Sequence, residues 1–356
     1  MRKRNGSAGP LGRVTALALF TLGTEALPGR LAAAGAVAWL CPLAAGAGYL
    51  ALAAWLLPGP RRQGSLPARE RTGAPERILS GLLLAWGLLL TAAQAARIGV
   101  RLADPLRGTP ELLTAAVLLL AGWMAAGGLA SLDRAAGIFA LAIGGAFALI
   151  LVFGLPSLSG EALILWSRQD LEGLPSGAAA AAETAAVGLY GLVLLEPGES
   201  LGGKRGGILG RMAGLAALLA LGELLVLGRL GPGLAARVDR PFFQMVAGLG
   251  FQGALQRLEE LVSALWLPGD LTLLALLLLS LRRLLARTAG RAEGVGWGWL
   301  LVGGAAALSL WQEARGPLLS GGGTAAGTLA AGVGILALVF LPEKSSKKEK
   351  KGVDKP

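Results

Sequence analysis

The hydropathy pattern of this chain is a series of long apolar runs separated by short breaks of charged, Pro and Gly residues. A helix needs about 20 mostly apolar residues, at about 1.5 Å per residue, to cross the hydrocarbon core of a bilayer. Runs of roughly this length occur at residues 11–28, 31–57, 78–103, 111–129, 135–153, 177–195, 208–227, 258–281, 295–311 and 324–341. The pattern therefore predicts an all-α polytopic membrane protein with about ten transmembrane helices over residues 1–341.

The positive charges are distributed unevenly between the two sides of these ten spans. Segments on the side of the N-terminus carry 23 of the 33 Lys and Arg residues, and the opposite side carries 10. Because cytoplasmic loops are enriched in Lys and Arg, we expect both termini to face the cytoplasm. An odd number of spans would remove this bias.

The two ends of the chain are basic. The MRKR start followed by an apolar run is similar to a signal peptide, but Pro28 and the immediate start of a second span favour an uncleaved helical hairpin. Residues 342–356 carry six lysines, so we expect a disordered cytoplasmic tail that helps to set the orientation or contacts anionic lipid.

Composition excludes several classes of protein. With 54% hydrophobic and 15% charged residues and a mean hydropathy of +0.62, the chain is too apolar for a soluble fold. The net charge of +11 is spread over short clusters between apolar runs without interleaved aromatic residues, which argues against nucleic-acid binding. One cysteine, no histidine and no phosphate-binding or dinucleotide-binding motif argue against an enzyme and against a cofactor. The expected environment is the lipid bilayer.

The run at residues 258–281 contains Pro268, Gly269 and Asp270 near its middle. A carboxylate at the centre of a membrane helix costs about 2.5–3.5 kcal/mol on insertion scales, so such a residue is expected to have a use. Pro268 and Gly269 leave backbone carbonyls without helical partners, and a local unwinding would surround a cation or a ligand amine with these carbonyls and the carboxylate. The alternative is a structural ion pair, or a protonated acid hydrogen-bonded to another helix.

The segment at residues 239–285 contains, in this order, Pro241, Arg257, Leu258, Glu259, Trp266 and Gly269. With these residues it resembles the B subunit of bacterial spore germinant receptors, the Ger-type spore germination permeases. The resemblance extends along most of the chain through Gly23, Pro28, Gly29, Ala34, Gly35, Trp39, Leu40, Thr109, Pro110, Ala126, Gly128, Leu129, Arg134, Gly228, Leu230 and Gly231. The family usually carries an acidic residue shortly before the tryptophan at Trp39, where this chain has Val37.

This resemblance implies an APC-superfamily fold of the LeuT type, with two inverted repeats of five helices and an interrupted first and sixth helix. It implies a small nutrient ligand, such as an amino acid, captured between spans one, three, six and eight in the spore inner membrane or the cell membrane. The implied partners are an A-type membrane subunit and a C-type lipoprotein, and the implied outcome is ion release during germination.

The candidate ligand-binding residues come from the weakened parts of spans one and six, together with a polar residue of span three and the aspartate of span eight. They are Gly23, Thr24, Glu25, Gln94, Gly188, Tyr190, Gly191 and Asp270. Simpler explanations stay open for several of them. With 56 glycines the chain has Gly in nearly every span, Glu25 can reach the outer water layer, and Gln94 can link two helices.

The remaining polar residues of the spans have structural explanations. Glu183 and Glu223 lie near span ends, where they contact water or act as proton relays, and Trp266 is typical of a packing anchor. Glu259 and Glu260 lie beside Arg257 and are expected to form an interfacial ion cluster.

Two further functions compete with the germinant-receptor subunit. One is a secondary amino-acid transporter of the same superfamily, coupled to sodium or protons through Asp270 or Glu25. The other is a structural subunit whose pocket has been filled by Ala and Leu, which the missing acidic residue before Trp39 keeps open.

Overall fold

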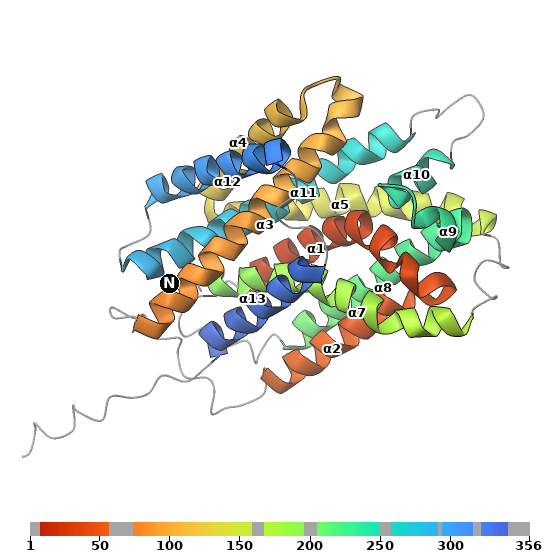
Figure 1. Cartoon of the computed structure of the whole chain (residues 1–356), viewed down its shortest axis with the longest axis horizontal. Helices are drawn as coiled ribbons and strands as arrows, with labels where there is room; N and C mark the ends of the chain where they lie inside the picture. Colours follow the sequence, from red (N-terminus) through yellow and green to blue (C-terminus); the bar gives the residue numbers. More distant parts are fainter. Residues whose placement is uncertain are drawn as a thin grey trace, which may run out of the picture.

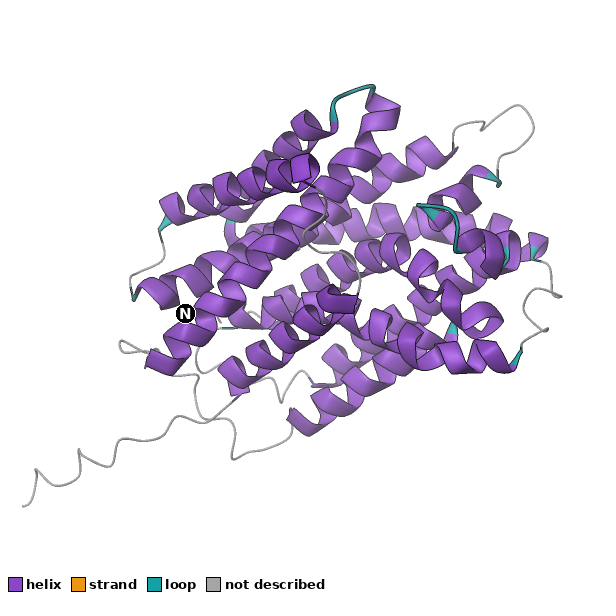
Figure 2. Ribbon diagram, viewed as in Figure 1, coloured by secondary structure: helices purple, strands orange, loops and turns teal. Residues whose placement is uncertain are grey.

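The computed structural model describes residues 8–56, 74–158, 167–195, 205–249, 258–290, 294–315 and 322–340, and every regular element in these ranges is helical (Figure 1 and Figure 2). The long helices are α1 (Ala8–Leu31), α2 (Leu40–Leu56), α3 (Ala74–Leu106), α4 (Pro110–Ala126), α5 (Gly128–Gly154), α7 (Arg168–Gly188), α8 (Arg205–Leu230), α11 (Leu258–Ala289), α12 (Val295–Arg315) and α13 (Gly322–Phe340). The short elements are η1 (Ala32–Val37), η2 (Leu155–Ser157), η3 (Leu189–Leu194), α9 (Pro232–Ala235) and α10 (Pro241–Ala247). The predicted all-α class is confirmed for the part of the chain that is described.

Within the described residues, five helices are long and apolar enough to cross a membrane, and they lie at Ala74–Ala103, Gly128–Ser157, Arg168–Leu194, Leu209–Leu230 and Glu260–Ala289. Three shorter apolar helices occur at Leu40–Leu52, Pro110–Ala126 and Thr324–Val339. The chain is therefore an integral membrane protein. Each of the ten predicted runs overlaps one of the long helices, while the predicted tail at residues 342–356 lies outside the described ranges.

Apolar side chains cover the outside of the bundle as well as its core. On α4 and α5, Trp123, Ile138 and Leu141 are 71%, 70% and 80% exposed. In water such surfaces would be unstable, but lipid tails solvate them as well as a protein core does. The fully buried positions concentrate on α11, whose residues from Leu273 to Leu279 are all buried. The helix α11 is thus central, and α4 and α5 present lipid-facing surfaces.

The long helices pack in matched pairs across the two halves of the chain (Figure 1). The first four helices each contact the helix five places later, which gives the pairs α1 with α7, α2 with α8, α3 with α11 and α4 with α12. Other contacts are also repeated when every helix is replaced by the one five places earlier or later. The contacts of α1 with α8 and α5, for example, correspond to those of α7 with α2 and α13. In the same way α11 packs on α4 and α5 as α3 packs on α12 and α13.

Two predicted helix breaks are wrong. The helix α1 is continuous through Gly23, Thr24 and Glu25, and α11 is continuous through Pro268 to Asp270. Neighbouring side chains and helices support a helix where Pro or Gly would weaken it in lipid. Gly269 of α11 packs on Thr21 of α1, and Gly23 of α1 packs on Leu219 of α8, so a neighbouring helix supports each position.

The sixth long helix, unlike the first, does change its helix type at the predicted candidate residues. The helix α7 ends at Gly188 and passes directly into the 3₁₀ segment η3, so Tyr190 and Gly191 lie where the helix type changes. The first helix is also followed by a 3₁₀ segment, η1, but this change comes after Leu31 rather than at Gly23.

The change after α1 depends on Gly35. Its φ of 52° and ψ of −136° are accessible to glycine but not readily to L-residues. A Cβ at this position would also collide with the carboxylate of Asp170. That carboxylate caps the start of α7, where the backbone N–H of Ser167 donates to it at 2.7 Å. The close approach of η1 to the start of α7 therefore requires glycine.

We expect Gly35→Ala to destabilise the protein by about 1–3 kcal/mol, because it adds backbone strain and a steric clash. The matched control is Gly48→Ala, since Gly48 lies inside α2 with open space around it. This control should be neutral or stabilising by up to about 1 kcal/mol. The midpoint of thermal unfolding in detergent, followed by reaction of a thiol dye with the buried Cys41, measures both. Equal midpoints for the two variants would contradict the role of Gly35.

Candidate functional site

A buried arginine joins three helices of the bundle. Arg101 of α3 is 2% exposed and donates from Nη1 to Glu25 of α1 at 2.5 Å and from Nη2 to Asp270 of α11. The guanidinium carbon lies 5.5 Å from the ring centroid of Phe243, a distance suited to a cation–π contact. The Nε atom of Arg101 has no hydrogen-bond partner among the described residues. One cation therefore holds two carboxylates from distant parts of the chain.

The ion network extends beyond these three residues. Arg97, an exposed residue one turn before Arg101 on α3, lies near enough to Glu25 and Glu183 for their charges to attract it and to Arg30 for that charge to repel it. Arg30 near the end of α1 forms an ion pair with Glu183 of α7. We call Glu25, Arg30, Arg97, Arg101, Glu183 and Asp270 the ion network. Its members come from α1, α3, α7 and α11, which are the predicted spans one, three, six and eight.

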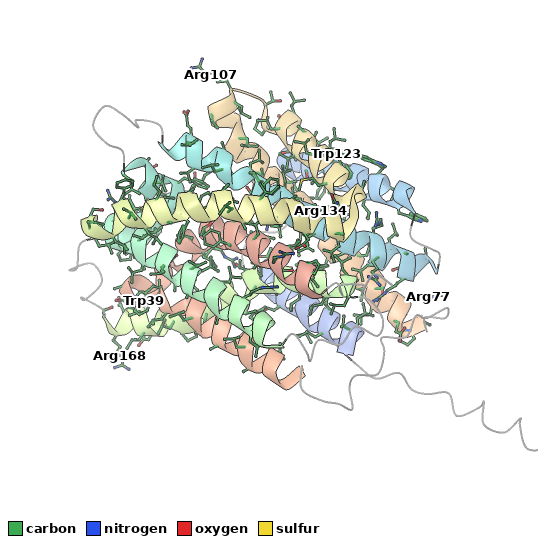
Figure 3. All side chains as sticks on the ribbon, turned by 180° about the vertical axis from the view of Figure 1, so that it is seen from behind. Trp39, Arg77, Arg107, Trp123, Arg134 and Arg168 are labelled. Carbon is green, nitrogen blue, oxygen red and sulfur yellow. The ribbon has the colours of Figure 1, made fainter. Side chains whose placement is uncertain are left out.

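The exposure of the network falls from the surface to the interior. The side chain of Arg30 is 38% exposed and that of Glu25 is 15% exposed. Arg101 and Asp270 are 1% and 3% exposed at the side chain. Arg77 near the start of α3 and Arg107 directly after its end contrast with Arg101, because both project from the periphery (Figure 3). The network is thus a series of charges that leads into the bundle.

Aromatic rings line the buried end of the network. Trp266 of α11 is fully buried, and its ring centroid lies 5.2 Å from that of Phe242 and 6.1 Å from that of Phe20. Its indole N–H donates to the hydroxyl of Thr24 at 2.8 Å. The predicted packing role of Trp266 is therefore accompanied by a hydrogen bond between α11 and α1.

The structure brings together some of the predicted site residues. Glu25 and Asp270 are both hydrogen-bonded to Arg101. Thr24, the residue before Glu25, accepts a hydrogen bond from Trp266, which lies one turn before Asp270 on α11. Asp270 thus has the ion pair that was its structural alternative, and Glu25 has a buried partner rather than water alone. Gln94 is buried on the same helix as Arg101, seven residues earlier.

The other predicted site residues lie elsewhere. Gly23 packs on Leu219 of α8, and Gly188 packs on Thr15 and Leu19 of α1. Gly191 lies beside Leu11, which is 14 residues from Glu25 and therefore about 21 Å away along α1. Tyr190 donates from its hydroxyl to the carbonyl of Leu83 at 3.0 Å, near the opposite end of α3 from Arg101. The candidate residues of the sixth span, Gly188, Tyr190 and Gly191, therefore do not surround the same point as Glu25 and Asp270.

Sequence reasoning missed Arg101, which it counted only among the charges outside the membrane. A signal was present, since Gln94, Arg97 and Arg101 recur at helical spacings of i, i+3 and i+7 on an otherwise apolar helix. Of the remaining acids, Glu183 pairs with Arg30, whereas Glu223 is buried with one carboxylate oxygen lacking a partner in the described part of the chain. Arg257, predicted to form an ion cluster with Glu259 and Glu260, lies outside the described residues.

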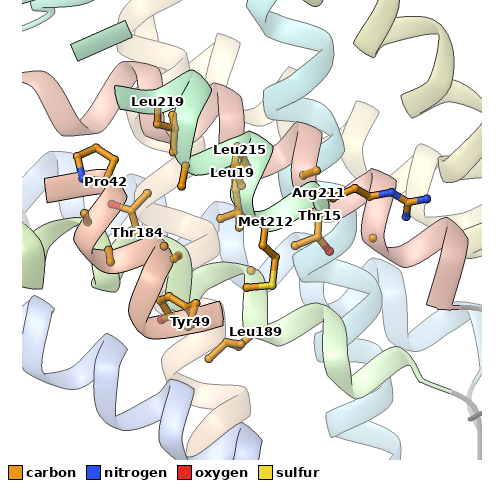
Figure 4. Close-up of a pocket in the computed structure, with 18 of the residues that line it drawn as sticks. Thr15, Leu19, Pro42, Tyr49, Thr184, Leu189, Arg211, Met212, Leu215 and Leu219 are labelled. Atoms are coloured by element: carbon orange, nitrogen blue, oxygen red, sulfur yellow. The ribbon is translucent and has the colours of Figure 1, made fainter. Parts of the chain in front are cut away.

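A separate cavity of about 210 Å³ lies between α1, α2, α7 and α8, with one residue of α13 at its wall (Figure 4). Its lining includes Gly188 but no member of the ion network. The lining is almost entirely apolar, unlike the network.

No protein-family profile matches the chain, and no curated protein sequence matches it. The chemistry of these sites is therefore the basis on which a function is assigned.

Proposed function

We propose that this chain is a permease-like membrane subunit that binds a small zwitterionic nutrient, such as an amino acid, at the ion network. The observation that carries the proposal is Arg101, buried between Glu25 and Asp270 at the meeting point of α1, α3 and α11. The resemblance to the B subunit of spore germinant receptors supports the same class of ligand. We propose the spore inner membrane as its location, with both termini in the cytoplasm.

The charges of the network complement those of an amino acid. A guanidinium binds a carboxylate through paired hydrogen bonds, and a carboxylate binds an ammonium group. In the absence of ligand, Arg101 compensates Glu25 and Asp270. An amino acid offers a carboxylate to an arginine of the network and an ammonium to Glu25 or Asp270. When the ligand replaces one of the existing ion pairs in this way, each buried charge keeps a partner of opposite sign. This exchange of partners avoids the large cost of an unpaired buried charge.

Such an exchange would change how the helices are held. Arg101 is an electrostatic link between α1 and α11, and a ligand that takes over one of its partners weakens that link. A ligand shifts the bundle only if its affinity differs between the linked and the unlinked state. In a germinant receptor this shift would promote ion release together with an A-type membrane subunit and a C-type lipoprotein.

The packing of the bundle supports the proposed ten spans and two inverted repeats. Most contacts of a long helix have a counterpart when each helix is exchanged with the one five places later. Each half also begins with a long helix followed by a 3₁₀ stretch, which is η1 in the first half, kinked at Gly35, and η3 in the second. Ligand sites in folds of this kind lie at the interface between the repeats. The ion network lies between helices of both halves.

A second candidate is an ion-coupled amino-acid transporter, which the gradient of exposure from Arg30 to Asp270 favours. A graded series of charges leading into a bundle is a feature of substrate and ion pathways. A structural subunit without a ligand is the third candidate.

Binding of radiolabelled amino acids to the purified chain in lipid nanodiscs tests the proposal. We expect at least one amino acid to bind, and Glu25→Gln and Asp270→Asn to weaken its binding about tenfold or more, because each removes a charged hydrogen-bond partner. The control is Asp133→Asn, which breaks the bidentate ion pair with Arg13 outside the network. Absence of binding to every amino acid, or equal weakening by Asp133→Asn, would contradict the proposal and favour the structural subunit.

Uptake measurements separate the two ligand-binding candidates. Liposomes that contain this chain alone would accumulate the bound amino acid under a sodium or proton gradient if it is a transporter. Binding without accumulation is the result expected for a receptor subunit. Co-purification of an A-type subunit and a C-type lipoprotein from the source cells would add independent support.

A further inference from the structure

The residues that line the cavity are spread along α1, α2, α7, η3 and α8 (Figure 4). Arg211 and Thr15 lie at one end, and Pro42 and Leu219 lie at the other. On α8 the lining runs from Arg211 to Leu219, eight residues or about 12 Å along the helix. Its volume of about 210 Å³ exceeds the roughly 150 Å³ of an engineered protein cavity that binds benzene. The cavity therefore has room for one extended chain of moderate length.

The wall offers almost no polar partners to a ligand. The hydroxyl of Tyr49 donates to the carbonyl of Ala182 at 2.8 Å, and the hydroxyl of Thr184 donates to the carbonyl of Ala180 at 3.0 Å. The rest of the lining is mainly Leu, Ala and Gly. A zwitterion placed here would lose its hydration without compensation. An alkyl chain gains about 0.8 kcal/mol for each CH₂ group that it removes from water.

The mouth of the cavity carries a positive charge. Among the described residues that line the cavity, Arg211 is the only charged one and none is acidic. One of its terminal nitrogens, Nη1, donates to the carbonyl of Gly9 at 3.0 Å and so places the guanidinium across the start of α1. A Cβ at Gly12 would lie 2.7 Å from the same nitrogen, so glycine makes room for it. A guanidinium has five N–H donors, which leaves donors available for an anionic head group.

We propose that this cavity binds a single saturated alkyl chain with an anionic head group, the chain lying between α2 and α8 and the head group at Arg211. The site is distinct from the ion network, with which it shares no lining residue. A free medium-chain fatty acid and one acyl chain of an anionic phospholipid have this shared chemistry. The experiment below distinguishes these two sources.

Photolabelling with octanoate that carries a diazirine at its methyl end tests the site in nanodiscs of zwitterionic phosphatidylcholine. We expect labelled peptides from α2 and α8 near Pro42 and Leu219, and protection by excess octanoate. Octylamine should protect much less, because its head group is repelled by Arg211. Arg211→Gln should reduce protection by octanoate about threefold, the modest effect expected for an exposed charge pair. The control Arg134→Gln removes another exposed arginine and should change nothing.

Two variants that fill the cavity, with a third that adds the same bulk elsewhere, distinguish loss of the binding site from loss of folding. Ala185→Phe and Ala45→Leu each enlarge a lining residue and should abolish the specific label. Ala140→Phe adds the same bulk to an exposed position of α5 and should retain it. Phosphatidylglycerol in the nanodisc will suppress the label if an anionic lipid is the usual occupant and will leave it unchanged if a free fatty acid is. Equal protection by octylamine and octanoate, or full labelling of both filled variants, would overturn the proposal.

Discussion

Replacing Arg101 by Leu is expected to destabilise the protein by about 3–5 kcal/mol, the cost of breaking a buried ion pair from one side. Glu25 and Asp270 would then face each other without the cation that compensates them. The bundle would lose its electrostatic link between α1, α3 and α11 at the same time. A large fall in the thermal unfolding midpoint, read from the accessibility of Cys41 in detergent, is the expected observation.

Two further variants identify the cause of this effect. Glu25→Leu/Arg101→Leu/Asp270→Leu removes the buried cation together with both of its carboxylate partners, so most of the lost stability should return, because apolar replacements of a buried ion cluster are often neutral or stabilising. Arg107→Leu removes an exposed arginine from the end of α3 and should change stability by no more than about 0.5 kcal/mol. If Arg101→Leu behaved like Arg107→Leu, Arg101 would not be the electrostatic link described above.

Truncation of Trp266 should have an effect of similar size. Trp266→Ala is expected to cost about 3–5 kcal/mol, because it leaves a large cavity among Phe20, Phe242 and Phe243. It also removes the hydrogen bond to Thr24 that links α11 to α1. The shift of the thermal unfolding midpoint measures the combined loss.

A conservative change divides this loss into its two parts. Trp266→Phe keeps much of the packing but removes the N–H donor, and should cost about 0.5–1.5 kcal/mol. Trp123→Ala removes the same side chain from a site that is 71% exposed and should be nearly neutral. A loss in Trp266→Phe as large as in Trp266→Ala would mean that the hydrogen bond, rather than the aromatic packing, is decisive.

Much of the fold was predictable because hydropathy is a local property. A run of apolar residues long enough to cross a bilayer has to satisfy its backbone internally, and a helix does so within the run itself. Each of the ten predicted ranges therefore overlaps a long helix, although the bounds differ by several residues at some ends. The same local reasoning failed at Gly23 and at Pro268, where neighbouring helices stabilise residues that weaken a helix in isolation.

The site was predictable in part, for a related reason. An acidic residue inside an apolar run is visible in the sequence, and Asp270 and Glu25 were identified in this way. Arg101 was not, because its position near the end of a run makes it indistinguishable from an interfacial arginine. Its partners lie 76 and 169 residues away in the chain, and no local pattern specifies them.

The amino-acid sequence by itself determined that this is a helical membrane protein, which helices it forms and which of them carry unusual polar groups. These properties depend on transfer of each segment from water to lipid, and that free energy is a sum over the residues of the segment. Only the tertiary structure decided that Arg101 pairs with Glu25 and Asp270, and that an apolar cavity opens between α1, α2, α7 and α8. Both depend on which faces of distant helices meet, because ion pairing and packing act over a few ångströms in space regardless of distance along the chain.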